Sequence, residues 1–322
     1  MSEGRLTVAI LTHWSDDFEE RRYLIKLMFP KWKEMGFETI VARDGGPFIP
    51  ASLAFVHCDL SVMPESIRRL AERYPRAING DARDIRKRRV SSLPLKPGDN
   101  YSGKVIVKTD WNGGGGQEFR ERVLKSLGWL LRTPGCRRIV VRFLKRVEAR
   151  RSWSKRRVLG FSHYSIFDGV GQVPAGVWEN PNLMVEPFRA ERDGRFYCCR
   201  HWLFLGTKEV TRRTLSLEPI VKVRGHIEPT NEQVPEELRA IRRRLGIDFG
   251  KFDYALVDGE AVLYDVNHTP GAHADASHHA ETISALAPAL TDFMSSAVGG
   301  KGTFIQQHAE AGGDHTNRQP EC

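Results

Sequence analysis

The sequence predicts an α/β protein that begins with an open α/β unit, and three observations support this prediction. Continuous apolar runs rich in β-branched residues, at 6–12, 38–42 and 53–58, are typical of buried parallel strands. Helical spacing of apolar residues at 18–35 and 64–74 places a helix after the first and after the third of these runs. Because strands that alternate with helices form a parallel sheet covered by helices, we expect a small open α/β domain here.

Three polar residues follow the first two expected strands, at the edge where open α/β sheets bind ligands. His13, Trp14 and Asp44 are therefore candidate substrate contacts. For His13 the commoner role of a hydrogen-bonded loop histidine stays open as the alternative.

The rest of the chain mixes strands and helices, which adds an α+β character to the prediction. The expected helices are 80–95, 117–131, 235–245 and 280–298, and the expected strands are 104–108, 183–188, 196–205, 254–257 and 261–266. The glycine-rich segment 164–178 is expected to be irregular. Segment 299–322 turns to Gly, His, Gln and acidic residues, so we expect a disordered tail there.

Composition indicates an ordinary globular protein, because 40% of the 322 residues are hydrophobic and 9% are aromatic. No run approaches the roughly 18 apolar residues of a membrane span, and the first apolar run is too short for a secretory signal. We therefore expect a cytoplasmic protein with no membrane span. The five cysteines show no metal-type spacing and an odd count, so they are interpreted as structural thiols: Cys58, Cys136, Cys198, Cys199 and Cys322.

The net charge of +9 is concentrated in the basic block 137–157, which has ten basic residues and one acidic residue, Glu148. Such a block can be a solvated surface, a docking surface for RNA or anionic lipid, or a contact for an anionic substrate or carrier. A solvated surface is the commonest of these outcomes, and the block alone does not choose among them.

Segment 251–271 predicts a tight β-hairpin, because apolar alternating runs flank Asp258-Gly259. Asp265 and Asn267 lie two residues apart and share a face of the second strand, while Asp253 lies near the start of the facing strand. Two carboxylates and one amide suit a hard divalent cation such as Mg²⁺. On these residues alone, a surface hairpin with outward polar residues is an equal alternative.

A lysine-bearing strand, 104–108, is followed by the segment 109–116, which ends in four consecutive glycines. Bare backbone N–H groups beside Lys108 could approach phosphate oxygens, although a glycine tetrad alone is more often a linker. Neither a P-loop ending nor a dinucleotide-binding glycine pattern is present. Arg224 is a further candidate for binding a substrate carboxylate or phosphate, with a surface salt bridge as its alternative.

The order of these parts is specific: an α/β unit, Lys108 with its glycine loop, a strand ending in Val-Glu-Pro-Phe188, and Asp253 with Asp265-Val-Asn267 before Thr-Pro-Gly. This order resembles the ATP-grasp superfamily of carboxylate-amine ligases. The resemblance covers roughly residues 6–298. It implies an N-terminal pre-ATP-grasp-like domain at 1–82 and an ATP-grasp domain at 83–298, whose basic lid region spans about 104–185.

The resemblance also implies roles for individual residues in binding ATP. The phosphates would be bound by Lys108 and by Lys87, or by Lys96 in place of Lys87. The lid loop would be Gly113, Gly114, Gly115 and Gly116, and the hinge segment beside adenine would be Glu186, Pro187 and Phe188. The ribose would be bound by Glu191 or Asp193, between which the sequence does not choose.

The same resemblance assigns Asp253, Asp265 and Asn267 as ligands of Mg²⁺, or Mn²⁺, and places Lys251 near the transferred phosphate. The expected catalytic residues are thus Lys251 and Arg224. One departure concerns Asp265, which stands where the superfamily usually has glutamate and is one methylene shorter.

The implied activity is that of an Mg²⁺-dependent, ADP-forming ligase that joins a carboxylate to an amine through an acyl phosphate. The expected partners are small-molecule or peptide carboxylates and amines, and an anionic substrate or carrier could meet the basic block. One alternative is a kinase-like phosphotransferase with the same fold. Another is a nucleic-acid or anionic-surface binding protein that uses the basic block 137–157 and has a degenerate nucleotide site.

Overall fold

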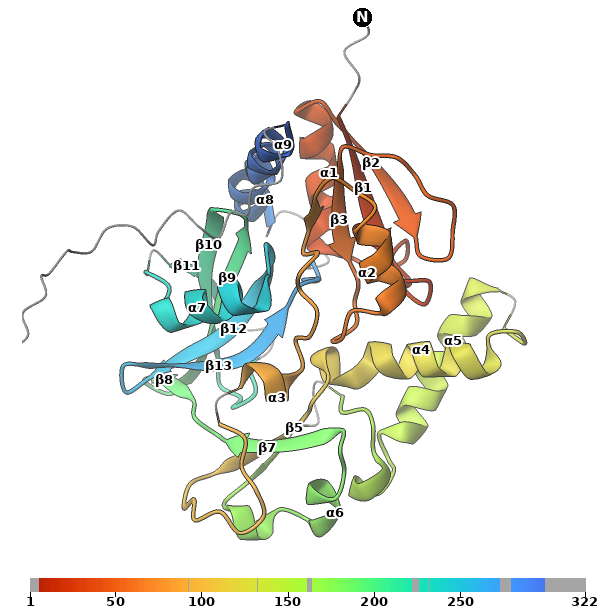
Figure 1. The fold of residues 1–322 in the computed structure, drawn as a ribbon. Helices are drawn as coiled ribbons and strands as arrows, with labels where there is room; N and C mark the ends of the chain where they lie inside the picture. The colour runs from red at the N-terminus through yellow and green to blue at the C-terminus, as the bar shows by residue number, and fades with distance from the viewer. Residues whose placement is uncertain are drawn as a thin grey trace, which may run out of the picture.

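A computed structural model describes residues 6–91, 93–131, 133–160, 164–221, 226–230, 232–272 and 279–298 of the chain. These residues form three sheets, with the N-terminal sheet beside a larger sheet and a small sheet on the far side of the hairpin (Figure 1). The observed mixture of helices and strands confirms the α/β class. None of the described helices combines the length and apolar character that a membrane crossing requires.

The N-terminal sheet is parallel and has the order β2-β1-β3-β4. Its strands are β1 (Leu6–Thr12), β2 (Phe37–Arg43), β3 (Leu53–His57) and β4 (Ala77–Ile78), with helices α1 (Leu24–Glu34) and α2 (Glu65–Ala71). The expected open α/β unit is therefore present. The helix expected from residue 18 begins only at Leu24, because Tyr23 has an extended backbone and forms an isolated β-bridge with Gly271.

The small sheet has the order β6-β5-β7 and is antiparallel. It consists of β5 (Val105–Thr109), β6 (Ser165–Phe167) and β7 (Leu183–Pro187). Between β5 and β6 the chain forms η1 (Asn112–Gly115), α4 (Gly116–Leu127), α5 (Pro134–Glu148) and η2 (Trp153–Lys155), and η3 (Val170–Gln172) and α6 (Ala175–Trp178) follow β6. Segment 164–178, expected to be irregular, thus contains a short strand and two short helices.

The large sheet has the order β11-β10-β9-β12-β13, and β8 pairs with β9. Its strands are β8 (Glu191–Asp193), β9 (Phe196–Leu205), β10 (Lys208–Ser216), β11 (His226–Thr230), β12 (Phe249–Val257) and β13 (Glu260–Asn267). Helices α3 (Lys87–Val90), α7 (Glu236–Leu245), α8 (Ala280–Leu286) and α9 (Leu290–Val298) complete the described chain, with η5 (Ala287–Ala289) between the last two.

Two expected helices are interrupted. The basic stretch 80–95 contains only the four-residue α3, and the helix expected at 280–298 is split by η5, where Pro288 cannot donate a backbone hydrogen bond. The hairpin expectation is confirmed, because β12 and β13 pair antiparallel. Asp258 and Gly259 have φ of 55° and 82°, the left-handed values that a two-residue hairpin turn requires.

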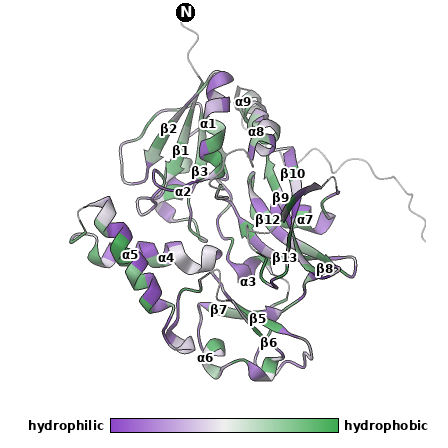
Figure 2. Cartoon of the chain, turned by 180° about the vertical axis from the view of Figure 1, so that it is seen from behind, coloured by the Kyte–Doolittle hydropathy of each residue, from purple (hydrophilic) through white to green (hydrophobic). Residues whose placement is uncertain are grey.

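The N-terminal sheet and the large sheet share a hydrophobic core. Buried Trp32 of α1 belongs to the same apolar cluster as Leu205 of β9 and Phe249 of β12, and its indole N–H donates to the Ala287 carbonyl at 3.1 Å. Viewed from behind, strands β1 and β2 of the N-terminal sheet are coloured largely as hydrophobic (Figure 2). Helices α8 and α9 complete the core and thereby set the position of the first domain against the hairpin.

Asn79 joins the same two sheets by hydrogen bonds. Its side chain accepts from the backbone N–H groups of Asp248 and Phe249, both at 2.9 Å, and donates to the Phe249 carbonyl at 2.9 Å. Its own N–H donates to the Asp248 carboxylate at 2.8 Å, and its φ is 59°. The Asn79-Gly80 step is therefore a fixed connection between the two sheets.

We expect Asn79→Ala to lower the free energy of unfolding by about 2–4 kcal/mol, because it leaves buried backbone N–H groups of β12 without acceptors. Asp258→Ala is the matched control, since it places alanine at a similar positive φ (55°) on the exposed hairpin tip and should cost only about 1 kcal/mol. Urea denaturation of both variants checks the difference. Equal losses would contradict the role of the Asn79 side chain.

Candidate active site

The hairpin places the three expected metal ligands on neighbouring positions of two paired strands. Asp253 of β12 is the register partner of Asp265 of β13, and Lys251 is the partner of Asn267. A β-bulge follows Asp253, so the pairing beyond it is shifted by one residue. The predicted register is thus confirmed near the open end of the hairpin.

Asp253 lies between two basic groups. Its Oδ2 accepts from the Lys251 ammonium at 2.9 Å, and its Oδ1 lies 2.5 Å from His201 Nδ1. Burial alone would raise the pKa of Asp253, but Lys251 and His201 outweigh burial and lower it below its ordinary value. Burial would likewise lower the pKa of Lys251, yet Asp253 raises it. The pair is therefore ionised at neutral pH.

Asp265, the register partner of Asp253, forms an ion pair with Lys87 of α3. The two charged atoms, Lys87 Nζ and Asp265 Oδ1, lie 2.6 Å apart, and Lys87 is 4% exposed. Burial would lower the pKa of Lys87, but the Asp265 carboxylate raises it above its ordinary value. Lys96, the alternative to Lys87, is exposed. The structure thus brings Lys87 to the hairpin.

Lys108 joins the small sheet to the hairpin. Its ammonium donates to Glu186 of β7 at 2.6 Å and to the backbone carbonyl of Tyr264 at 3.4 Å. Both charged side chains are buried. Together with Lys87–Asp265 and Lys251–Asp253, this contact makes three lysine–carboxylate pairs around the hairpin.

The other residues expected to bind the nucleotide have different kinds of partners. Phe188 follows β7 and donates its N–H to the Lys104 carbonyl at 2.7 Å, and Pro187 pairs with Val105. Glu191 holds Arg200 with both carboxylate oxygens, and Asp193 lies 3.2 Å from Arg213. Both ribose candidates therefore face arginines, and their roles stay predictions. Arg224 lies outside the described residues.

The glycine tetrad is not an open loop, which differs from the expectation. Gly113, Gly114 and Gly115 have φ of 54°, 68° and 74° and form a compact left-handed turn that leads into α4. A Cβ at Gly114 would lie 2.1 Å from the Leu159 carbonyl oxygen, so the backbone packs too closely for any side chain. Gly116 begins α4, against Lys145 Nζ. Phosphate binding by this segment stays a prediction.

A small, partly open hollow lies at the carboxyl edge of the N-terminal sheet, beside the hairpin; this hollow is called the cavity below. It is lined by His13, Ser15, Asp16, Asp59, Leu60 and Gln117. His13 lines this space, whereas Asp44 accepts a hydrogen bond from the Trp14 backbone at 3.0 Å. A route of hydrogen bonds links the cavity to the hairpin, since Thr269 Oγ1 donates to Asp59 at 2.7 Å and the Thr269 N–H donates to Asn267 at 2.8 Å.

Asp16 and Asp59 differ in how their charges are compensated. Asp59 binds Arg21, accepts a hydrogen bond from Gln117 and lies 3.0 Å from the Tyr23 hydroxyl. Asp16 Oδ1 accepts from Tyr23, but Oδ2 is buried and has no hydrogen-bond partner among the described residues. Burial and the nearby Asp59 charge raise the pKa of Asp16 to about 7. Asp16 can therefore change its protonation state near neutral pH.

Several of these residues were not identified from the sequence: Asp16, Asp59, Thr269, Cys199 and His201. Asp59 directly follows an expected strand, and Cys199 and His201 lie two residues apart on another and so share one of its faces. These positions weakly indicate a site. Their partners come from distant parts of the chain, which no local spacing reveals.

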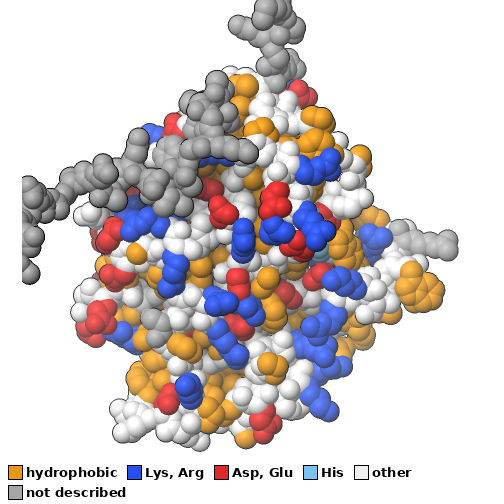
Figure 3. Space-filling model, in the orientation of Figure 1, with side chains coloured by type: hydrophobic (Ala, Val, Ile, Leu, Met, Phe, Trp, Pro, Cys, Tyr) orange, Lys and Arg blue, Asp and Glu red, His pale blue; other side chains and the backbone are white. Residues whose placement is uncertain are grey.

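The basic block forms most of α5 and the turn after it. Figure 3 shows Lys and Arg side chains over this part of the molecule. Its one acid, Glu148, is buried and accepts from the Arg157 backbone N–H at 3.1 Å. Three apolar residues four positions apart on α5 are nevertheless exposed: Ile139 (67%), Phe143 (63%) and Val147 (44%). An arginine-rich surface and an apolar stripe thus lie side by side on one helix.

No protein-family model matches the sequence, and no curated protein matches it. The fold is similar to a RimK domain ATP-grasp protein from Sphaerobacter thermophilus DSM 20745, with 12% identity, 90% of this chain and 99% of that chain covered, and a TM-score of 0.44. It is also similar to a D-cycloserine synthetase (12%, 89% and 99%, 0.42) and to D-alanine–D-alanine ligase from Bacillus anthracis (9%, 91% and 97%, 0.43).

These matches have 9–12% identity and TM-scores below 0.5, so no argument rests on them. The contacts of the described residues have to support any function.

We expect Asp16→Asn to stabilise the protein at pH 8 but not at pH 4. The unfolded carboxyl loses its proton near pH 4, whereas the folded one keeps it to about pH 7, so native stability falls as the pH rises between these values. Asparagine can still accept a hydrogen bond from Tyr23 but does not ionise. The variant should therefore have a free energy of unfolding at pH 8 that is higher by roughly 2–4 kcal/mol, before solvent relaxation is considered. Denaturation curves across the pH range measure it, and parallel curves for both proteins would contradict it.

Proposed function

We propose that this protein is an ATP-grasp enzyme, an Mg²⁺-dependent and ADP-forming ligase that joins a carboxylate to an amine through an acyl phosphate. The observation that carries the proposal is the set of three lysine–carboxylate pairs around the hairpin. Lys108–Glu186 is buried and the other two pairs are partly buried. Such ion pairs add little net stability relative to apolar packing, so three of them at one place favour a binding role. We also retain the cytoplasmic location as a prediction.

The same six groups can exchange partners when Mg-ATP binds. Phosphate oxygens can replace the carboxylates around Lys87 and Lys108, and a divalent cation can replace the lysines around Asp253 and Asp265. Asn267 adds a neutral oxygen on the same strand face. This donor set of two carboxylates and an amide fits Mg²⁺, which supplies positive charge to the transferred phosphate. Asp265 is shorter than glutamate, and its position opposite Asp253 keeps it within the site.

The reaction then depends on positioning the substrates and on neutralising the phosphate charge, and it needs no dedicated protein nucleophile. A substrate carboxylate oxygen bonds to the γ-phosphorus while ADP leaves, and Lys251 stabilises the negative charge there. The amine nitrogen next bonds to the acyl carbon, and phosphate leaves with the bonding electron pair. The amine must lose a proton in this second step.

The cavity beside the hairpin is our proposed site for the amine. Asp59 is held by Arg21, so the free Oδ2 of Asp16 is the oxygen that can accept a hydrogen bond from an ammonium or amine. The pKa of about 7 allows Asp16 to take up the amine proton at neutral pH. The Asp59–Thr269–Asn267 hydrogen bonds connect this cavity with the proposed metal site.

The decisive experiment measures ADP release across a panel of carboxylates with amines. A ligase releases ADP only when both substrates are present and forms an amide, whereas a kinase-like enzyme forms a phosphorylated product without an amine. Lys108→Met should reduce turnover by at least 100-fold, because a buried phosphate contact is lost. Undiminished ATP binding in Lys108→Met and in Asp265→Ala would contradict the proposed site.

Loss of folding is separated from loss of binding by a paired variant. Lys108→Met alone leaves Glu186 buried and unpaired, whereas Lys108→Met with Glu186→Gln removes both charges and should recover most of the stability. The double variant is expected to unfold near the wild-type midpoint and still fail to bind ATP in calorimetry.

A second candidate function, compatible with the first, is binding of an anionic lipid surface by α5. The exposed stripe Ile139, Phe143 and Val147 can enter the acyl boundary while neighbouring arginines contact lipid phosphates. An apolar stripe has no comparable use in contacting an RNA backbone. Figure 1 shows α4 and α5 projecting from the body, as such docking requires.

Two variants distinguish lipid from RNA as the partner of α5. Phe143→Ser and Arg142→Glu should each lower sedimentation with phosphatidylserine vesicles by about tenfold, because both apolar and electrostatic contacts contribute. RNA binding would instead be lost only in Arg142→Glu. Both positions are exposed, so the fold is unaffected. No sedimentation of the wild-type protein with anionic vesicles would reject the lipid function.

A further inference from the structure

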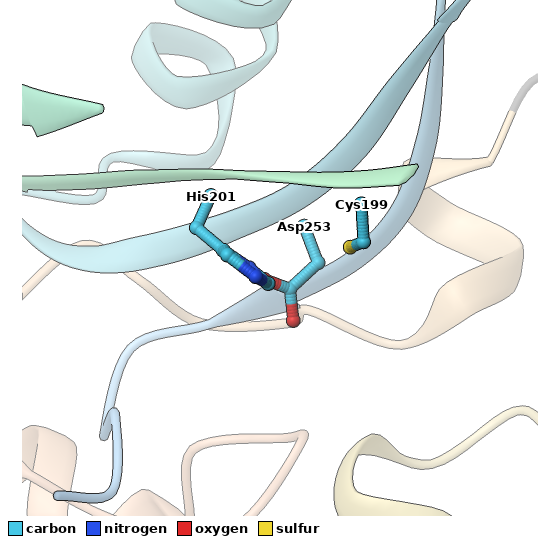
Figure 4. Close-up of side chains that lie close together, drawn as sticks. All are labelled: Cys199, His201 and Asp253. Carbon is cyan, nitrogen blue, oxygen red and sulfur yellow. The ribbon is translucent and has the colours of Figure 1, made fainter. Parts of the chain in front are cut away.

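Cys199, His201 and Asp253 lie together on one face of the large sheet. Cys199 and His201 are two residues apart on β9 and therefore project to the same side, and Asp253 of β12 is the register partner of His201. Their potential ligand atoms all lie within 4.8 Å of one another. In Figure 4 the Asp253 side chain lies between the other two, with the sulfur of Cys199 turned towards it.

We propose that these three residues bind a thiophilic divalent cation such as Zn²⁺, and that this site shares Asp253 with the proposed Mg²⁺ site. Thiolate, imidazole and carboxylate are the three donor types that zinc takes in proteins. Mg²⁺ accepts oxygen donors, so the sulfur and nitrogen select for the softer ion. The expectation that all cysteines are structural thiols is thereby revised for Cys199.

The surroundings of each ligand suit this role. Cys199 is 7% exposed, and its sulfur makes only a weak contact of 3.8 Å with the Arg200 carbonyl. His201 Nε2 lies 2.8 Å from Thr214 Oγ1, so a proton on Nε2 can be donated to Thr214 while Nδ1 binds the ion. Asp253 offers Oδ1 towards His201 and keeps Oδ2 on Lys251. A water or substrate atom can complete four-coordination.

Binding requires a small local change. His201 Nδ1 and Asp253 Oδ1 are 2.5 Å apart, whereas two ligands of a tetrahedral zinc ion are separated by about 3.3 Å. Side-chain rotations that separate these two atoms by about 1 Å would admit the ion between them. The Cys199 thiol gives up its proton to solvent as the sulfur–metal bond forms.

The experiment uses Co²⁺ as a spectroscopic probe on the reduced full chain without nucleotide, in a Cys136→Ser, Cys322→Ser background. A cobalt–thiolate charge-transfer band in the near ultraviolet is expected at one equivalent, and Zn²⁺ should displace it. Cys199→Ser should abolish the band. The matched control is Cys198→Ser, the neighbouring buried thiol that points to the opposite face of β9 and should keep it.

Thermal unfolding of both serine variants without metal confirms that each is folded. A wild-type protein without the band, or a band that persists in folded Cys199→Ser, would overturn the site. A band lost equally in both variants would also reject the assignment to Cys199.

One consequence rests on the proposed ATP-dependent function. Because both ions need Asp253, Zn²⁺ should inhibit ATP turnover competitively with Mg²⁺, and Cys199→Ser should raise the inhibitory Zn²⁺ concentration by at least tenfold. A protein with the cobalt band but without ATP turnover would keep the thiophilic site and reject the proposed function. Turnover that is equally sensitive to Zn²⁺ in both serine variants would reject the shared site.

Discussion

The Lys108–Glu186 ion pair is the contact on which the arrangement of the proposed site depends. Lys108 and Glu186 come from neighbouring strands of the small sheet, and the same ammonium reaches the Tyr264 carbonyl of the hairpin. A buried lysine is costly unless it is paired, so Glu186 stabilises the ammonium within the small sheet, and the hydrogen bond to Tyr264 connects that sheet with the hairpin. The small sheet and the hairpin therefore meet at charged side chains.

An ion pair and side-chain hydrogen bonds also fix the chain on the opposite side of the hairpin. Lys87 reaches Asp265 from α3, and Asn79 fixes the preceding chain to β12 through its side chain. The carboxyl edge of the N-terminal sheet, where Asp16 and Asp59 lie, therefore contacts the end of the hairpin at Thr269. A proposed acceptor cavity and a proposed phosphate site become neighbours because short connections and one shared core leave little freedom between them.

Charge balance also explains why one aspartate can belong to two proposed metal sites. One carboxylate oxygen of Asp253 contacts Lys251 and the other contacts His201, so the two oxygens have different surroundings. Oxygen ligands from β13 favour a hard ion, whereas sulfur and nitrogen from β9 favour a soft one. Competition at such a position would make the proposed activity sensitive to the type of divalent ion.

The sequence by itself determined the α/β unit, the hairpin with its register, and the grouping of Asp253, Asp265 and Asn267, because strand periodicity and turn chemistry are local properties. Only the tertiary structure decided the compact turn of the glycine tetrad, the choice of Lys87 as the partner of Asp265, and the meeting of Cys199 and His201 with Asp253. These depend on which strands become neighbours and on which buried charges need partners. Such constraints join residues far apart in the chain, so no local pattern records them.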